Sequence, residues 1–285
     1  MTESVLARID PGRIKFEPFP HLHISEALDP AYYAALAEAF PSMEQVAGEK
    51  PMGNNTAHLL SAKDVVEDPA IPAIWREFFS YHCSTVFFRE LLRFWASALE
   101  REYPGLEARF GKPLEMLSTG MRYKSWEKTP ENLKADMMLD CQFGINSPVT
   151  APCSVRGPHV DKPHKLFAGL LYFRRPDDAS TGGDLGLYRL RTERYYHDGR
   201  LDVRPNFVEQ VAEVPYRPNT LIMWLNTPRS LHGVSPRSVC AVPRRYVNLL
   251  AECYTLATDG FFQVKQNFAV HALRAVRRLA GMRDA

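Results

Sequence analysis

Cysteine is scarce in this sequence, and long runs of apolar residues are missing. The five cysteines, at positions 83, 141, 153, 240 and 253, are odd in number and include no CxxC pair. They predict neither a disulfide framework nor a thiolate zinc site. No stretch approaches the roughly 20 apolar residues that span a bilayer, and the N-terminus lacks the apolar core of a signal peptide. We therefore expect a cytoplasmic protein without an integral membrane segment.

An excess of charge of either sign is also missing. The chain has 35 basic and 33 acidic residues and a formal net charge of +2, which does not require a nucleic-acid partner. Its 285 residues, 45% of them hydrophobic, can bury one large core or two modest ones. We expect a single domain over residues 1–285, with a mainly helical part at 1–113, a β core at 114–256 and a C-terminal helix at 257–285. No feature of the sequence indicates an oligomeric state.

Apolar residues recur at helical spacing in the first third of the chain. In DPAYYAALAEAF, Asp29 can cap a helix and Pro30 suits its first turn. Two further apolar stripes, at 71–79 and 88–99, predict helices that face a core. The polar stretch EKPMGNNTAHLLSAKD, residues 49–64, is expected to be a connecting loop.

From about residue 114, short segments rich in β-branched and aromatic residues replace the helical pattern. Turns that contain Gly, Pro or Asn separate them. The six segments are MMLDCQFGI, KLFAGLLYF, DLGLYRL, FVEQVAEVPY, NTLIMWLN and RYVNLLAECY. Such a series without intervening helices predicts a β-sandwich or barrel.

The segment GPHVDKPHK, residues 157–165, contains the pair His159 and Asp161. Side chains two positions apart in an extended chain lie on the same face, so this pair can bind one metal ion. A polar surface loop is the simpler alternative. His232, in NTPRSLHGVSPR, is the candidate third ligand, because two histidines and one carboxylate form the facial triad that binds Fe(II). Zinc is a weaker interpretation, since the HExxH motif is absent.

Two arginines, Arg244 and Arg245, open the last predicted strand. A guanidinium inside a barrel would need an anion, and its planar fork matches a carboxylate. Strand alternation puts the two arginines on opposite faces without deciding which face is inside. Asn146 and Gln142 could also contact a cosubstrate or substrate, although hydrogen bonding at a sheet edge is the simpler use. Lys165 is expected on the surface.

The ordered segments GPHVDKP, GLLYFRRPDDASTGGDLGLYR, TPRSLHGVSP and RRYVNLLAE resemble the Fe(II)/2-oxoglutarate-dependent oxygenase superfamily, specifically its prolyl-hydroxylase-like bacterial branch. The resemblance implies a double-stranded β-helix, which is a jelly-roll, cupin-like core, with a helical annex. It implies three iron ligands: His159, Asp161 and His232. It assigns the distal carboxylate of 2-oxoglutarate to Arg245, with Arg244 as a rival because the preceding loop is longer than is common. Tyr172 falls where some relatives place a hydroxyl on that carboxylate.

By the same resemblance, Fe(II) and O₂ are the cofactors and 2-oxoglutarate is the cosubstrate. The expected reaction is hydroxylation of an unactivated C–H bond, with desaturation as an alternative. The expected partner is a small polar molecule, such as an acidic sugar, an amino acid or a component of a natural product or polysaccharide. Two other classes stay open, a cupin-like protein that binds a metal or ligand without turnover and a metal hydrolase that uses bound water.

Overall fold

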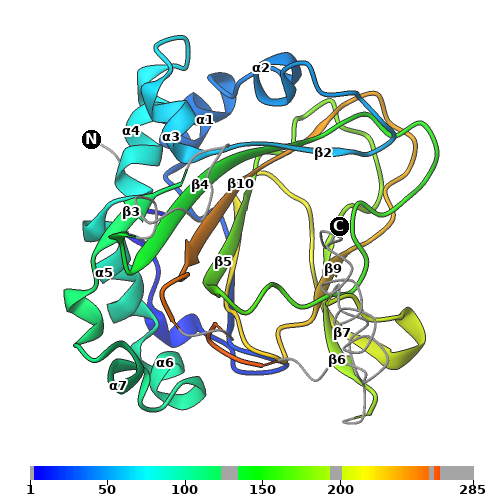
Figure 1. The fold of residues 1–285 in the computed structure, drawn as a ribbon. Coiled ribbons are helices and arrows are strands. Elements are labelled where there is room, and N and C mark those ends of the chain that lie inside the picture. The colour runs from blue at the N-terminus through cyan, green and yellow to red at the C-terminus, as the bar shows by residue number, and fades with distance from the viewer. Residues whose placement is uncertain (1–2, 123–133, 193–200, 257–259, 264–285) are drawn as a thin grey trace, which may run out of the picture.

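Two β-sheets and a group of helices make up the protein in a computed structural model, which describes residues 3–122, 134–192, 201–256 and 260–263 (Figure 1). Apart from residues 260–263, the C-terminal helix expected at 257–285 lies outside the described residues. Among the described residues, no helix combines the length and the apolar character that a membrane crossing requires.

The larger sheet is built around the longest strands of the chain. Its order is β1 (His21–Ser25), β8 (Thr220–Leu225), β5 (Lys165–Tyr172), β10 (Arg244–Glu252), β4 (Met137–Asn146) and β2 (Ala57–Leu60), with β3 (Thr119–Met121) also paired to β4. The smaller sheet has the order β7 (Val208–Val214), β6 (Leu185–Leu190) and β9 (His232–Val234). Neighbours are antiparallel except β3 and β4. All six segments predicted as strands contain strands of these sheets.

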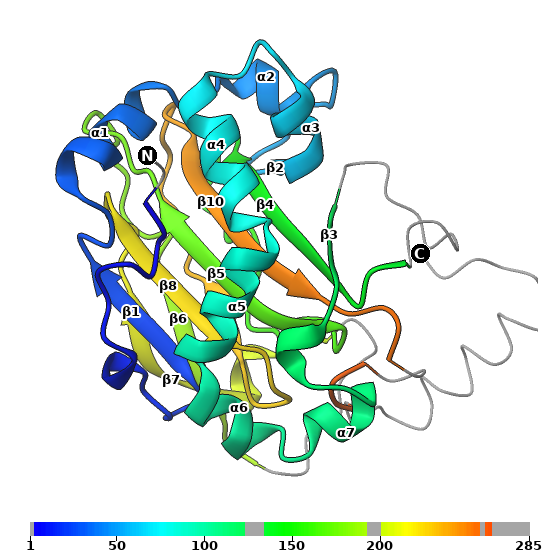
Figure 2. The same cartoon turned by 90° about the vertical axis from the view of Figure 1, so that its left-hand side faces the viewer.

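The described helices all precede residue 114, apart from short 3₁₀ turns. They are α1 (Pro30–Glu38), α2 (Met43–Ala47), α3 (Ala62–Glu67), α4 (Ala73–His82), α5 (Thr85–Phe94), α6 (Ala96–Glu102) and α7 (Leu106–Phe110). As predicted, Asp29 caps α1, because its carboxylate accepts hydrogen bonds from the backbone N–H groups of Ala31 and Tyr32. Helices α4, α5 and α6 run across one face of the larger sheet (Figure 2).

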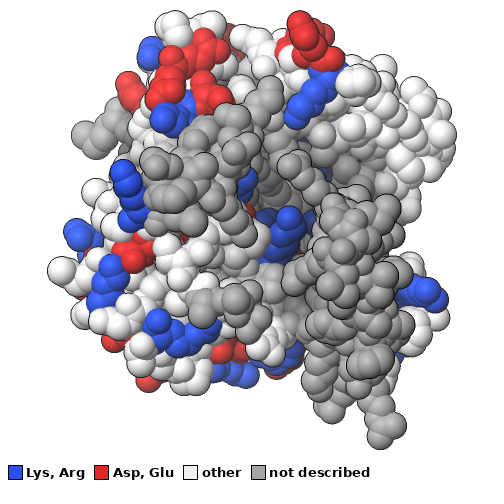
Figure 3. Space-filling model, in the orientation of Figure 1, with Lys and Arg blue, Asp and Glu red and all other residues white. Residues whose placement is uncertain are grey.

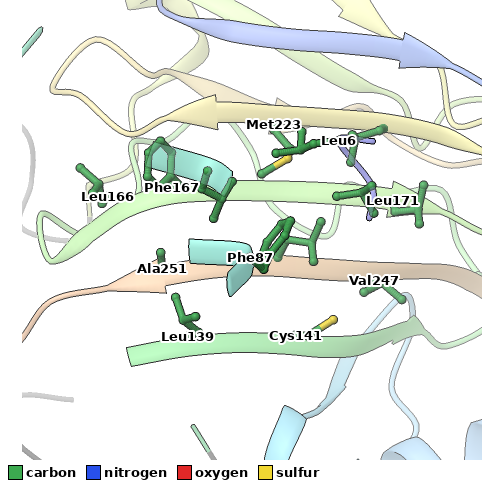
Figure 4. Close-up of a cluster of buried hydrophobic side chains, with 14 of the residues drawn as sticks. Leu6, Phe87, Leu139, Cys141, Leu166, Phe167, Leu171, Met223, Val247 and Ala251 are labelled. Atoms are coloured by element: carbon green, nitrogen blue, oxygen red, sulfur yellow. The ribbon is translucent and has the colours of Figure 1, made fainter. Parts of the chain in front are cut away.

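The larger sheet buries both of its faces. The outer face packs on the helices, and Phe87 of α5 lies against side chains of β4, β5, β8 and β10 (Figure 4). The inner face packs against the smaller sheet through a second group, here called the inner cluster. Its members are Phe19, Ala168, Tyr172, Leu185, Leu187, Val214, Tyr216, Ile222, Trp224 and Tyr246. Burying one large apolar side chain stabilises the folded state by about 1.5–3 kcal/mol. The apolar side chains on the helix side and those of the inner cluster therefore provide much of the free energy that favours folding.

The prediction of a connecting loop at 49–64 is wrong over the second half of this segment. Residues Ala57–Leu60 form β2, which pairs with Ile145 and its neighbours on β4, and α3 begins at Ala62. Strand β1 likewise joins the larger sheet from the N-terminal part of the chain, at Trp224 and its neighbours on β8. Strand β2 is short and pairs at the border of a sheet formed by longer strands, so backbone hydrogen bonds place it where side-chain periodicity is too brief to predict a strand.

Candidate metal centre

Backbone hydrogen bonds join the segment that contains His159 and Asp161 directly to His232. The N–H of His159 donates to the carbonyl of His232 at 2.9 Å, and the N–H of His232 donates back to His159 at 3.0 Å. The two imidazole centroids are 4.2 Å apart as a result. A Cβ on Gly233 would lie 2.7 Å from backbone atoms of Gly157 and Pro158, so only glycine allows this close approach.

Both imidazoles have their Nδ1 atoms engaged with the backbone. Nδ1 of His159 lies 2.8 Å from the carbonyl of Gly157, and Nδ1 of His232 lies 2.9 Å from the carbonyl of Ser230. A carbonyl oxygen only accepts, so Nδ1 carries the proton in each ring and the lone pair is on Nε2. Burial, together with the adjacent His232, lowers the pKa of His159 well below its ordinary value. Burial also lowers the pKa of His232, so both rings are neutral near pH 7.

Asp161 completes the group from the same loop as His159. Its Oδ2 lies 3.8 Å from Nε2 of His232, and its Oδ1 accepts a hydrogen bond from Nζ of Lys165 at 3.1 Å. Burial alone would raise the pKa of this carboxyl, but the charge and hydrogen bond of Lys165 hold it well below its ordinary value. The expectation of a surface Lys165 was wrong, because its side chain is only 19% exposed and bends back to Asp161.

The three side chains offer ligand atoms that all lie within 4.8 Å of one another, and all three residues are buried. Two neutral imidazole nitrogens and one ionised carboxylate are a donor set that suits a divalent transition metal. The backbone hydrogen bonds at Nδ1 orient the rings, which is the outer-shell arrangement usual for metal-binding histidines. The residues present therefore fit an ion of this kind.

Arg244 lies on the inner face of the larger sheet. Its guanidinium carbon lies 4.9, 4.7 and 5.0 Å from the ring centroids of Tyr172, Tyr216 and Tyr246. Its Nε donates to the carbonyl of Gly183 at 3.1 Å. Arg244 is 2% exposed, and within the described part of the chain its Nη2 has no hydrogen-bond partner at normal distance. A buried cation with an unused donor can accept an anionic partner.

Tyr172 offers a second unused polar group beside Arg244. Its hydroxyl is buried and, among the described residues, has no hydrogen-bond partner at normal distance. Burial raises the pKa of Tyr172 to about 12, against the opposing charge of Arg244, so the hydroxyl stays protonated and can donate. Together these two side chains provide donors for one carboxylate.

Arg245 lies on the other face of β10, as strand alternation requires. Its guanidinium carbon is 4.8 Å from the centroid of Phe40, and its Nε donates to the carbonyl of Phe173 at 3.2 Å. Phe40 and Phe173 both belong to the apolar core between the larger sheet and the helices. The structure therefore brings Arg244, and not Arg245, to the inner cluster.

The two polar residues predicted on β4 have different surroundings. Asn146 is fully buried beside Arg244, its cross-strand partner, and its Nδ2 lies 3.4 Å from Oδ1 of Asn55. Its own Oδ1 has no hydrogen-bond partner among the described residues. Gln142 is engaged instead, accepting from Asn248 at 3.0 Å and donating to a carboxylate oxygen of Asp140 at 2.7 Å.

Trp224 was not singled out by sequence reasoning, yet it connects the candidate ligands to the inner cluster. Its ring centroid lies 4.4 Å from that of His232, and His232 is the cross-strand partner of Leu187. Because Trp224 and Leu187 belong to the same cluster as Tyr172, His232 and Arg244 contact one apolar cluster between the sheets. In the orientation of Figure 1, Lys and Arg side chains are visible in a recess near the middle of the molecule (Figure 3).

Comparison with known proteins gives a similarity of overall structure. A scan against protein-family models finds no match, and a search of curated proteins finds no relative by sequence. Among solved structures, the chain is similar to prolyl 4-hydroxylases and to iron- and α-ketoglutarate-dependent enzymes.

Three of these solved structures illustrate the degree of similarity in sequence, coverage and fold. A prolyl 4-hydroxylase from Pseudomonas putida is 12% identical, covers 86% of this chain and 98% of its own, and has a TM-score of 0.44. A prolyl 4-hydroxylase from Phytophthora capsici is 15% identical over 91% of this chain and 68% of its own, with a TM-score of 0.46. The epimerase SnoN, in complex with Fe³⁺ and α-ketoglutarate, is 13% identical over 86% of this chain and 82% of its own, with a TM-score of 0.47.

Proposed function

We propose that this protein is an Fe(II)- and 2-oxoglutarate-dependent dioxygenase that hydroxylates a C–H bond of a small polar molecule. The observation that carries the proposal is the buried group of His159, Asp161 and His232, whose ligand atoms lie within 4.8 Å of one another. The two sheets that enclose the inner cluster would be the halves of a double-stranded β-helix, with residues 1–285 as one domain.

The roles of the three ligands follow from their chemistry. Nε2 of His159, Nε2 of His232 and one oxygen of Asp161 would occupy one face of an octahedral ion. The remaining positions would stay open for a chelating keto acid and O₂. Ferrous iron, when bound there with 2-oxoglutarate, supplies the activation of O₂ that oxidation of a C–H bond requires. The protein contributes orientation and a site shielded from bulk water.

Arg244 is proposed as the partner of the distal carboxylate of 2-oxoglutarate. It has an unused Nη2 donor at the inner cluster, and the unpartnered hydroxyl of Tyr172 lies beside it. A carboxylate at this position would satisfy both groups and neutralise a buried charge. The side-chain Oδ1 of Asn146, also unpartnered among the described residues, could accept from a water or ligand group at the same end. Arg245 would stabilise the packing against Phe40 instead.

The test of this function is binding of Fe(II) and 2-oxoglutarate under anaerobic conditions. The wild-type complex should show a weak metal-to-ligand charge-transfer band in the visible, and His232→Ala should abolish it. Arg229→Ala is a matched control, because Arg229 lies in the same loop, has an exposed side chain and pairs with Glu102, away from the candidate ligands. A wild-type protein that shows no band, or a His232→Ala variant that shows the same band, would refute the proposal.

The substrate would be sought by substrate-stimulated turnover. Acidic sugars, free amino acids and short peptides are incubated with the loaded enzyme, and succinate release is measured above the rate without substrate. A compound that stimulates release and gains one oxygen atom identifies the class. Loss of two hydrogens without oxygen gain would show desaturation instead.

A further inference from the structure

The two oxygens of the Asp161 carboxylate have different neighbours. Oδ2 lies 3.8 Å from Nε2 of His232, on the side of the candidate ligands. Oδ1 accepts a hydrogen bond from Nζ of Lys165 at 3.1 Å. The carboxylate is 7% exposed and the Lys165 side chain 19%, so water competes little for this contact. A charge-assisted hydrogen bond of this kind fixes the orientation of the carboxylate plane.

The backbone that carries both side chains is itself held in place. Nδ2 of Asn226, just after β8, donates to the carbonyl of Lys162 and to the carbonyl of Lys165, each at 3.1 Å. The N–H of Lys165 closes the turn onto Lys162 at 3.0 Å. Asn226 is fully buried. The backbone of Lys165, the first residue of β5, is therefore fixed in position, and its side chain loses little conformational freedom when it contacts Asp161.

The other carboxylate near Lys165 is already engaged. Glu252 is the cross-strand partner of Lys165 on β10. Its Oε2 accepts hydrogen bonds from Nη1 of Arg122 and from the hydroxyl of Tyr254, the latter at 2.7 Å, and its Oε1 lies 3.7 Å from Nε2 of His164. Because Glu252 has these donors, the ammonium group of Lys165 is directed to Asp161.

This arrangement has a consequence for the number of ligands. A carboxylate with both oxygens accessible can chelate a metal ion, whereas a carboxylate with one oxygen held by an ammonium supplies one ligand atom. Building on the function proposed above, we propose that Lys165 is a positioning residue that keeps Asp161 a one-oxygen ligand. Three positions of an octahedral ion then stay open, which are the two that a chelating keto acid needs and one for O₂.

The experiment counts water molecules on a bound ion and needs no turnover. Mn(II) is bound to the wild-type protein and to Lys165→Met, without 2-oxoglutarate, and the relaxation rate of water protons is measured across magnetic fields. Three coordinated waters are expected in the wild type and two in Lys165→Met, because the released carboxylate chelates. The relaxivity of the bound ion should therefore fall by about a third.

Two further variants separate this role from a general loss of structure. Lys165→Arg keeps a donor to Oδ1 and should retain the wild-type relaxivity. Lys162→Met removes a lysine from the same turn, where the side chain is exposed, and should also match the wild type. If Lys165→Met keeps three waters, if it no longer binds Mn(II), or if Lys165→Arg falls as far as Lys165→Met, the assignment of Lys165 is overturned. Failure of the wild type to bind Mn(II) would instead remove the metal site on which it rests.

Discussion

The position of Arg244 leads to a quantitative prediction about cosubstrate binding. Its guanidinium is 2% exposed, and Nη2 has no hydrogen-bond partner within the described residues. Removing one partner of a buried, hydrogen-bonded charge pair costs about 2–5 kcal/mol, and each 1.4 kcal/mol is tenfold in affinity. Arg244→Met should therefore raise the Kd for 2-oxoglutarate by roughly 30-fold or more. Arg244→Lys should give an intermediate value, since it keeps a charge but loses the planar fork.

Arg245→Met is the matched control for this measurement. The neighbouring arginine contacts Phe40 and the carbonyl of Phe173 on the opposite face, so its loss should leave the Kd for 2-oxoglutarate unchanged. The assay is an anaerobic titration of the Fe(II)-loaded protein with 2-oxoglutarate, followed by the charge-transfer band or by calorimetry. Thermal unfolding of each variant confirms that it is folded. If Arg245→Met weakens binding more than Arg244→Met, the assignment of the anion site to the inner face is wrong.

Three further predictions concern the frame of the site and the core. Gly233→Ala should weaken Mn(II) or Fe(II) binding at least tenfold by titration, because the added Cβ would lie 2.7 Å from the backbone of Pro158 and separate the two histidine segments. Phe143→Ala should lower the free energy of unfolding by about 3–5 kcal/mol in urea, since Phe143 is fully buried among aromatic rings. Burial raises the pKa of Asp140 to about 6, so the folded state binds this proton more tightly than the unfolded chain. The protonated carboxyl therefore stabilises the folded state below about pH 4, and this stabilisation is lost as the pH rises through 6. Between these pH values the free energy of unfolding of the wild type should fall by about 1–3 kcal/mol relative to Asp140→Asn, as measured by urea unfolding at several pH values.

Periodicity and capping chemistry predicted the local elements well. The six strand segments and the cap at Asp29 follow from signals that lie within ten or so residues of one another. Strand β2 could not be predicted in the same way, because AHLL is too short to show alternation and its pairing with β4 depends on residues far along the chain. The interaction that places it is made by backbone groups, which carry no sequence signal.

The candidate ligands were easier to propose than the residues around them. His159, Asp161 and His232 were suggested by the chemistry of a facial triad and by the order of the motifs, and the structure brings them within reach of one ion. The resemblance assigned the distal carboxylate to Arg245, and strand alternation could not test that choice, because it gives opposite faces without naming the inner one.

Lys165 was expected on the surface, since an isolated lysine next to a loop is usually exposed. Its contact with Asp161 depends on how the turn before β5 is held by Asn226, a residue 61 positions further along the chain. Trp224 lies in the predicted strand NTLIMWLN, and only the fold shows that its ring adjoins His232. In both cases the deciding contact is between segments that are distant in sequence.

The two backbone hydrogen bonds between His159 and His232 have a consequence for how the protein matures. They tie the imidazoles together by main-chain atoms alone, so the chain can reach its final shape first and collect an ion afterwards. Under the proposed function, we expect protein made without metal to be folded and to become active when Fe(II) is added.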